Sequence, residues 1–371
     1  DDAARRLELA TAASDRAEDD WFAAKAHTHE RHKFTLFPSI EVLAKFRDHQ
    51  IGGIGLEPQD FMLTDKNFGL FEEIKIPTFQ KGEIEADLLS SFLKSVEILE
   101  SLRKALEIEH FSQEFFDVFF GNLVEVHHNG GLFGTIKVLQ REVLTSFFAI
   151  RTAHRSAIAT ELHARETAAP PRAVLELGGG FGKSLADLVR IFPAATALYV
   201  DLPVNMAVAA HYFDGRFPGR VNLVWRDTDA VRAGMVNVVA PWLIDKFDPP
   251  IDLMINFLSM HHMPQRTMDF YFARLIAPKV RFFYHENRLV PRNAEEGEGL
   301  LEKTPERAKM EMCHSVQIPW GNPKLKTFSE FMRNPALTEG GVDRSTMNGG
   351  REARQPPAGA TGAGSKPSAC R

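Results

Sequence analysis

Cysteine and long apolar runs are both scarce in this chain. Its 371 residues include two cysteines, Cys313 and Cys370, which are too few for a disulfide framework or a cysteine-based zinc site. No stretch reaches the roughly 18 to 20 apolar residues that a membrane-spanning helix needs. These absences predict a cytoplasmic protein that does not act in a membrane.

An excess of charge of one sign is also missing. The 44 Lys and Arg residues face 49 Asp and Glu residues, which gives a net charge of -5. Nucleic-acid-binding proteins usually carry a basic face, so we expect no nucleic-acid partner. With 44% hydrophobic and 25% charged residues, the composition is that of a globular protein of about two domains at roughly 150 residues each.

The first part of the chain, residues 1–168, reads as a mostly helical domain. Apolar residues recur at helical spacing over 88–99 and again over 115–123, and both stripes predict buried helix faces rather than an aromatic ligand cage. Residues 136–150 are expected to form another long helix. We expect this domain to serve substrate binding or assembly, including assembly into a homo-oligomer.

The pattern changes at residue 169. After Pro170-Pro171, which stop any helix, short apolar runs alternate with helical segments. This alternation is typical of βα units on a mainly parallel, doubly wound sheet, which is the Rossmann-like α/β fold class, and we assign it to residues 169–339. The predicted strands are 173–177, 197–200, 221–225, 253–257 and 280–284. Residues 340–371 contain no aromatic residue and are expected to be a disordered tail.

A glycine-rich segment follows the first of these strands. It reads Val174-Leu175-Glu176-Leu177-Gly178-Gly179-Gly180-Phe181-Gly182-Lys183-Ser184. The dinucleotide pattern G-x-G-x-x-G fails in both registers, and the triphosphate pattern would need a glycine at Leu177. A carboxylate at Glu176 would also repel a phosphate. S-adenosylmethionine has no phosphate and carries two cationic groups, so an acid beside it attracts, and glycines let the backbone approach it.

The segment resembles motif I of the class I S-adenosylmethionine-dependent methyltransferases. Other features of that family follow in chain order. Asp201 lies at the next strand end, 21 residues beyond Gly180, where such folds place an acid on the ribose hydroxyls, and Asp227 follows the third strand, where the family sets an acid near the adenine. The resemblance implies this cofactor-binding set: Glu176, Gly178, Gly180, Gly182, Asp201, Leu202, Asp227 and Asn256.

The segment Asn256 to Pro264 is similar to a Leu-His-His-Leu-Pro segment of small-molecule methyltransferases. Together with the Tyr-Val-Asp-Leu-Pro wording around Asp201 and the helical N-terminal part, it resembles the putative sugar O-methyltransferases. The resemblance covers about residues 170–335 and implies methyl transfer to a hydroxyl of a sugar or of a sugar-bearing small molecule. Two alternatives stay open. The chain could methylate another small molecule at a phenol oxygen or at nitrogen, or it could be a protein that binds the cofactor without turnover.

Proton removal from the acceptor needs a base at the carboxyl ends of the strands. His261 and His262 qualify because histidine titrates near neutral pH, and His262 is preferred, although the family segment often serves packing instead. His285 and Glu286, after the fifth strand, are rival bases within a substrate set that also includes Asn287. Asp252, at the opposite strand end, is expected to be structural.

No metal site is expected from the sequence. The histidines at 27–32 lie in a charged stretch and are read as a solvated face, because a metal needs further ligands. Those at 127–128 are read as a turn that ends a helix. Mg²⁺ stays open, because some sugar methyltransferases that resemble this chain use it, but no carboxylate cluster requires it.

Overall fold

The structure, a computed structural model, describes residues 81–124, 133–201, 203–248, 250–263, 265–288, 301–318 and 326–338. The predicted tail at 340–371, the histidines at 27–32 and 127–128, and Leu202 lie outside these residues.

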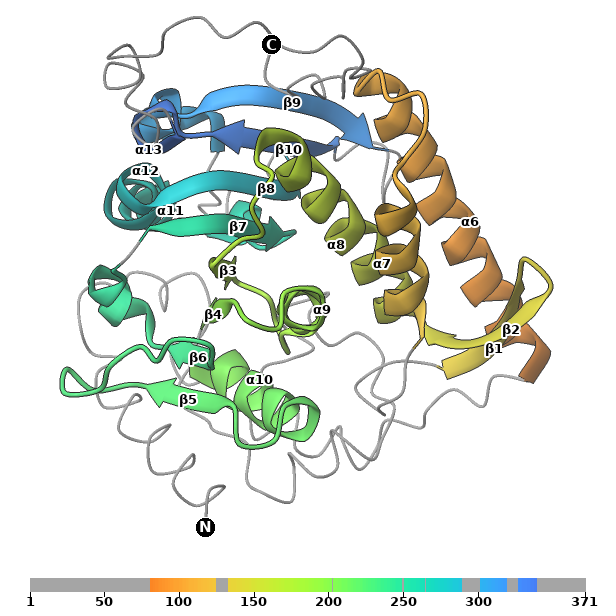
Figure 1. The fold of residues 1–371 in the computed structure, drawn as a ribbon, viewed down its shortest axis with the longest axis horizontal. Helices are drawn as coiled ribbons and strands as arrows, with labels where there is room; N and C mark the ends of the chain where they lie inside the picture. Colours follow the sequence, from red (N-terminus) through yellow and green to blue (C-terminus); the bar gives the residue numbers. More distant parts are fainter. Residues whose placement is uncertain are drawn as a thin grey trace, which may run out of the picture.

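An eight-stranded sheet forms the centre of the molecule (Figure 1). Its strand order is β5-β6-β4-β3-β7-β8-β10-β9; the first six run parallel, and β10 is antiparallel to both neighbours. This arrangement confirms the α/β prediction. The strands are β3 (Ala173–Leu177), β4 (Thr196–Val200), β5 (Val221–Val224), β6 (Val236–Val239), β7 (Ile251–Phe257), β8 (Val280–Arg288), β9 (Glu311–Ile318) and β10 (Thr327–Arg333).

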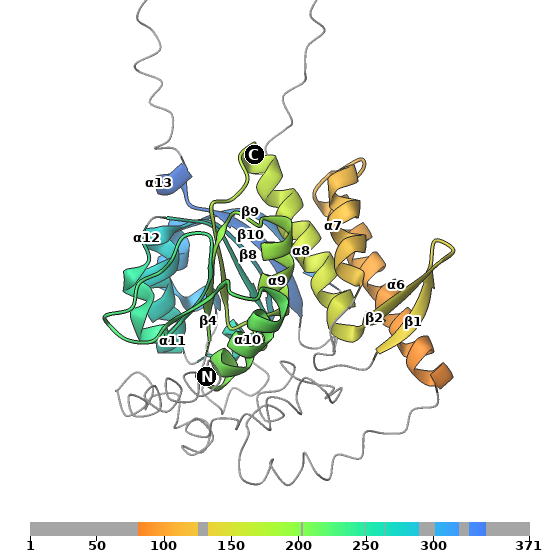
Figure 2. The same ribbon diagram turned by 60° about the horizontal axis from the view of Figure 1, so that its bottom comes forward.

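Helices cover both faces of this sheet (Figure 2). One face carries α8 (Phe147–Glu166), α9 (Lys183–Ile191) and α10 (Pro203–Arg216), and the other carries α11 (Gln265–Tyr271), η5 (Phe272–Ile276) and α12 (Ala277–Lys279). Outside α8 lie α6 (Lys81–Ala105) and α7 (Gln113–Leu123). Short segments complete the described chain: η3 (Pro241–Lys246), η4 (Met260–His262), η7 (Leu301–Lys303), η8 (Pro305–Lys309) and α13 (Pro335–Thr338).

The helix predicted over 136–150 is wrong for most of its length. A hairpin of β1 (Phe133–Val138) and β2 (Arg141–Ser146) occupies this segment, and α8 begins only at Phe147. Its turn, Leu139-Gln140, has positive φ at both residues (47° and 64°), which matches the twist of a hairpin. The usual Asn-Gly or Asp-Gly signal is absent, so nothing in the sequence marked the turn.

The sheet also contains a strand that the sequence did not predict. The sequence predicted 221–225 as the third strand, but β6 lies between that segment, β5, and β4. The signal for β6 was only the four-residue run Val236–Val239 after Gly234, whose φ is +68°. Strand β6 therefore separates the end of β5, and with it Asp227, from β4.

The buried apolar residues of the described ranges form one continuous cluster. Phe115 and Phe119 of α7 are buried in it, which confirms their predicted core role, whereas Phe116 of the same stripe is 39% exposed. The cluster includes residues on both sides of position 168, and α8 packs against both α7 and α9. The boundary at 168/169 stays a prediction.

Candidate cofactor and acceptor site

Three glycines with positive φ shape the loop between β3 and α9. Gly178, Gly180 and Gly182 have φ values of +69°, +62° and +88°, a region that other residues enter at a cost. A side chain at Gly178 would also collide with Ser259, whose Cβ lies 2.7 Å from the position of an added Cβ. At Gly182 the added atom would meet the ring of Phe213.

Glu176 lies beneath this loop and is 1% exposed. Its Oε2 accepts a hydrogen bond from the N–H of Leu185 at 2.9 Å, so the carboxyl group caps the first turn of α9. Burial raises the pKa of Glu176 to about 8, against the opposing effect of the bonds from Leu185 and Ser184. The side chain is therefore mostly uncharged at neutral pH, and it attracts a cation less than the sequence argument assumed.

The raised pKa gives a stability prediction for Glu176→Gln. Between about pH 5 and 8 the folded protein retains a proton that the unfolded chain releases, so this group lowers wild-type stability by about 1.4 kcal/mol per pH unit as the pH rises. The unfolding free energy of the variant minus that of the wild type should therefore rise by about 1.4 kcal/mol per pH unit up to about pH 8 and stay constant above it. Denaturant titrations at several pH values measure it, with the exposed Glu114→Gln as control; a constant difference would show that Glu176 is charged throughout.

Asp201, at the end of β4, makes a hydrogen bond to the same glycine loop. Its carboxylate accepts from the N–H of Gly180 at 2.9 Å, from Tyr199 Oη at 3.0 Å and from Asn205 Nδ2 at 3.0 Å. The Tyr199 hydroxyl also contacts the carbonyl of Gly180, and its single proton is donated to one of these two oxygens at a time. The predicted neighbours Gly180 and Asp201 are thus in direct contact. Asp201 is itself buried, with 8% of the residue exposed.

Asp227 does not join this group. It is exposed in the turn after β5, and β6 separates that strand from β4. The neighbouring Asp229 stabilises the turn by accepting from the N–H groups of Trp225 and Arg226 at 2.9 and 2.8 Å. The strand that lies beside β4 is β6. The residues that follow it, Ala240-Pro241-Trp242, include no acid. A contact of Asp227 with the adenine stays a prediction that its position disfavours.

A chain of amide hydrogen bonds crosses the carboxyl ends of β3, β7 and β8. Asn256 Nδ2 donates to the carbonyl of Leu177 at 2.6 Å, Asn287 Nδ2 donates to Asn256 Oδ1 at 2.9 Å, and Asn287 Oδ1 lies 3.3 Å from His261 Nδ1. The carbonyl of Leu177 can only accept a hydrogen bond, so it fixes the orientation of the Asn256 amide. Asn256 in turn fixes the orientation of the Asn287 amide. Asn287 therefore presents an acceptor to His261, which favours a proton on Nδ1 and a basic lone pair on Nε2.

Hydrogen bonds through Asn287 and Asn256 thus link His261 to Leu177, the residue before the glycine loop. His261 is buried, with 3% exposed, in the turn η4. The backbone of His262 belongs to the same turn, but its side chain is outside the described part of the structure, so the preference for His262 stays a prediction. The contact with Asn287 makes His261 a candidate base.

The rest of the predicted substrate set divides between the two faces of β8. His285 lies 3.1 Å from Glu330 through Nε2, whereas Glu286 is fully buried on the α8 side with Arg155 at 2.7 Å and His154 at 3.3 Å. Burial alone would raise the pKa of Glu286, but Arg155 and His154 together lower it to about 2. A carboxylate held ionised in this way is a poor proton acceptor at neutral pH.

Several residues at the site carried no motif in the sequence. Ser259, which contacts Gly178, and Asn205, which binds Asp201, have common residue types in turns and helices. Arg151 and Arg155 of α8 had a usable signal, because their spacing of four residues places them on one face of a helix. Asp252, expected to be structural, accepts from the N–H groups of Arg172 and Ala173 at 2.7 and 3.1 Å.

Two further searches of the described residues gave no site. No group of three or more His, Cys, Asp and Glu side chains within the described ranges is arranged to hold a metal ion. None of the helices in that part of the chain is both long and apolar enough to cross a membrane.

Comparison with known proteins gave likenesses of structure only. No protein-family model and no curated protein matches the chain. Solved structures that resemble part of it include the mitomycin 7-O-methyltransferase MmcR (13% identity, 50% of this chain and 57% of that chain, TM-score 0.32). Others are the N-methyltransferase NodS of Bradyrhizobium japonicum with S-adenosyl-L-homocysteine (13%, 49% and 86%, 0.33) and the Burkholderia thailandensis 1,6-didemethyltoxoflavin-N1-methyltransferase (18%, 47% and 76%, 0.32). The chain thus spans little more than half of MmcR, and TM-scores this low establish no shared function.

Proposed function

We propose that this chain is an S-adenosylmethionine-dependent methyltransferase that methylates a hydroxyl group of a small molecule, with a sugar or sugar-bearing molecule as the preferred acceptor class. The proposal rests on the glycine loop, Asp201 and the base candidate at the carboxyl end of one sheet. Ligands of open α/β sheets bind at this end.

One observation carries the choice of cofactor. In nucleotide-binding α/β folds, the free N–H groups at the start of the helix after the glycine loop bind a phosphate. Here the carboxyl group of Glu176 accepts a hydrogen bond from the N–H of Leu185 in the first turn of α9. It therefore occupies the place that a phosphate would take. A ligand without phosphates, with a ribose for Asp201, fits these residues better than a dinucleotide or a triphosphate.

The chain's own residues then have distinct tasks. The positive-φ glycines turn the loop at the end of β3 toward the ligand's methionine part, and the carboxylate of Asp201 would accept hydrogen bonds from the ribose hydroxyls. The bound cofactor would supply an electrophilic methyl group on a sulfonium. His261 would remove the acceptor proton at Nε2, and Asn287 is a positioning residue that holds its tautomer.

The cofactor assignment predicts the effect of Asp201→Ala. Loss of the carboxylate removes two hydrogen bonds to the ribose, so affinity for S-adenosylhomocysteine should fall by about 2 to 3 kcal/mol, as measured by calorimetry. Asp229→Ala is the matched control, because it also removes a carboxylate that binds backbone N–H groups, but beyond the edge of the proposed site. Equal affinities of the Asp201 variant and the wild type would refute the assignment.

A turnover screen separates transfer from mere binding. The full chain is incubated with the cofactor and panels of sugars, phenols and amines, and S-adenosylhomocysteine release is measured. Release with sugars supports the proposal, and release with phenols or amines alone refutes the sugar acceptor. Cofactor binding without release in any panel would indicate a binding protein.

A further inference from the structure

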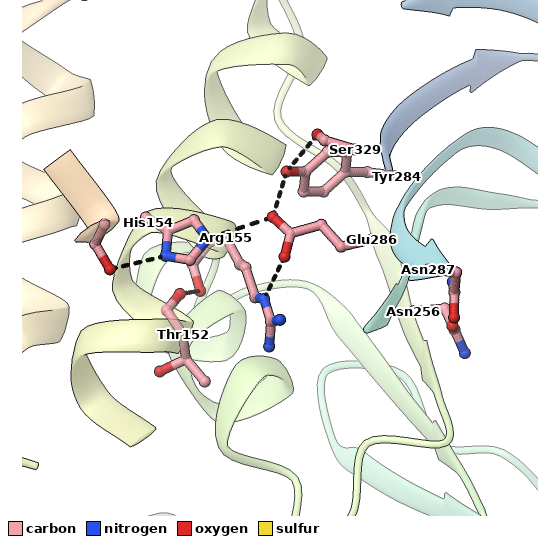
Figure 3. A network of polar contacts seen from close by, with 10 residues as sticks. Thr152, His154, Arg155, Asn256, Tyr284, Glu286, Asn287 and Ser329 are labelled. Carbon is pink, nitrogen blue, oxygen red and sulfur yellow. Dashed lines mark hydrogen bonds and ion pairs between the residues drawn. The ribbon is translucent and has the colours of Figure 1, made fainter. Parts of the chain in front are cut away.

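A cluster of guanidinium groups lies on the α8 side of the sheet. Arg151 and Arg155 are one turn apart on α8, and Arg288 follows Glu286 on the same face of β8. Figure 3 shows Arg155 and His154 of α8 directed toward the carboxylate of Glu286, while Asn256 and Asn287 lie beyond β8. Tyr284 also donates to this carboxylate, at 3.1 Å.

Arg155 is held in place but is not saturated. Its Nε donates to Glu286 Oε2 at 2.7 Å, and its guanidinium lies 4.8 Å from the ring centroid of Phe257. The side chain is 7% exposed. Its Nη2 is buried without a hydrogen-bond partner, although buried polar atoms are nearly always satisfied. The guanidinium therefore offers an oriented donor with nothing bound to it.

The local charges point to an anion as the missing partner. Burial and the neighbouring charge of Arg155 lower the pKa of Arg151 to about 10, although Glu286 opposes this effect. The carboxylate of Glu286 thus interacts with both Arg155 and Arg151, whose guanidinium groups repel each other. Buried positive charge is stabilised by an anion with matching hydrogen bonds.

The cluster lies at the end of the sheet where the proposed reaction occurs. Glu166, at the last turn of α8, is 3.6 Å from Arg333, which pairs with the amino-terminal part of β8. The first turns of α8 consequently lie at the carboxyl end of the sheet. Phe257, under the guanidinium of Arg155, is two residues before Ser259, which contacts the glycine loop.

We propose that Arg155, through its unpartnered Nη2, and Arg151 bind an oxyanion of the acceptor, so that the acceptor is an acidic small molecule carrying a carboxylate or a phosphate. The identification of this ligand as the acceptor rests on the proposed function. A purely structural Arg155–Glu286 ion pair would instead leave the protein indifferent to the charge of small ligands.

Equilibrium dialysis with matched ligands tests the site without any turnover. The full chain, with and without S-adenosylhomocysteine, is titrated with glucuronate, glucose 6-phosphate and glucose, and with benzoate and benzamide as a second charged and neutral pair. At least one anion should bind about tenfold or more tightly than its neutral counterpart, as expected for hydrogen bonds to a charged group. The preferred anion distinguishes carboxylate from phosphate.

The variants then assign the binding to the cluster. Arg155→Gln and Arg151→Gln should each weaken the preferred anion about tenfold and leave the neutral ligand unchanged. Because Arg155→Gln leaves Glu286 short of its partner, folding is checked by circular dichroism, and Arg151→Gln keeps the Arg155–Glu286 pair intact. Arg103→Gln is the matched control, since Arg103 pairs with Glu100 on α6, away from the cluster.

Two results would overturn this inference. One is the absence of any preference for an anion in the wild type, and the other is undiminished anion binding in folded Arg151→Gln and Arg155→Gln. Failure of the proposed function has a different signature. In that case S-adenosylhomocysteine does not bind, while the anion preference and its dependence on the two arginines remain.

Discussion

Replacing Gly178 with alanine is expected to reduce the affinity for S-adenosylhomocysteine roughly a hundredfold or more. The added Cβ meets Ser259, and the residue also has to keep a φ of +69°. Positive φ costs a non-glycine residue about 1 to 2 kcal/mol, and overpacking costs about 1 to 3 kcal/mol. The loop can escape both only by moving away from Asn256 and Asp201.

Two other glycines provide matched controls for this experiment. Gly219 has a φ of +74° but open space around its Cα, and Gly215 has open space without a positive φ. Gly219→Ala should therefore cost stability without affecting the ligand, and Gly215→Ala, in the last turn of α10, should leave the ligand affinity unchanged and raise stability slightly, because alanine favours a helix more than glycine does. Calorimetry and thermal denaturation measure both quantities; unchanged ligand affinity in Gly178→Ala would show that the loop does not form the binding site.

The glycine loop was predictable from sequence because its signal is local. The strand, the acid and the glycines lie within 10 consecutive residues from Ala173 to Gly182, and a change in hydrophobic period marks the flanking helix. The contact of Gly180 with Asp201 was also accessible, because parallel neighbouring strands end at one edge of a sheet. Strand β6 was missed, although its four residues equal the length of β5, which was predicted.

The buried charges could not be found in this way. Arg155 and Glu286 are 131 residues apart, and no local pattern links a helix before the glycine loop to a strand near the end of the sheet. Glu286 was selected as a rival base because it follows a strand. Its surroundings, which decide its pKa, come from α8, so only the three-dimensional structure shows that it is already an ionised partner of Arg155.

The amide chain illustrates the same limit for the base. The sequence offered two adjacent histidines and no means of choosing between them, because neighbouring residues of a turn point in different directions. For His261 the structure adds the contact with Asn287, since an amide oxygen held in place by Asn256 favours the proton on Nδ1. Asn287→Leu should remove this control, and Asn287→Asp, which still accepts from Nδ1, should retain more activity.

Replacing His261 with alanine is expected to lower turnover roughly a hundred- to ten-thousandfold, the usual contribution of a general base. Affinity for S-adenosylhomocysteine should stay near the wild-type value, because Asp201 and the glycine loop bind the cofactor. Turnover of the wild type should also fall on the acid side of neutrality, since an imidazolium cannot accept a proton. The measurements are single-turnover rates with an acceptor from the screen, together with cofactor titrations.

The adjacent residue and an exposed histidine complete this test. His262→Ala should retain turnover within about tenfold of the wild type if Nε2 of His261 is the base, and His110→Ala, on the exposed loop after α6, should have no effect. A large loss of turnover in His262→Ala with little loss in His261→Ala would instead assign the base to His262. If both retain turnover, the pair serves packing, and His285, on the same face of β8 as Asn287, becomes the next candidate, because Glu286 is already held ionised by Arg155 and His154.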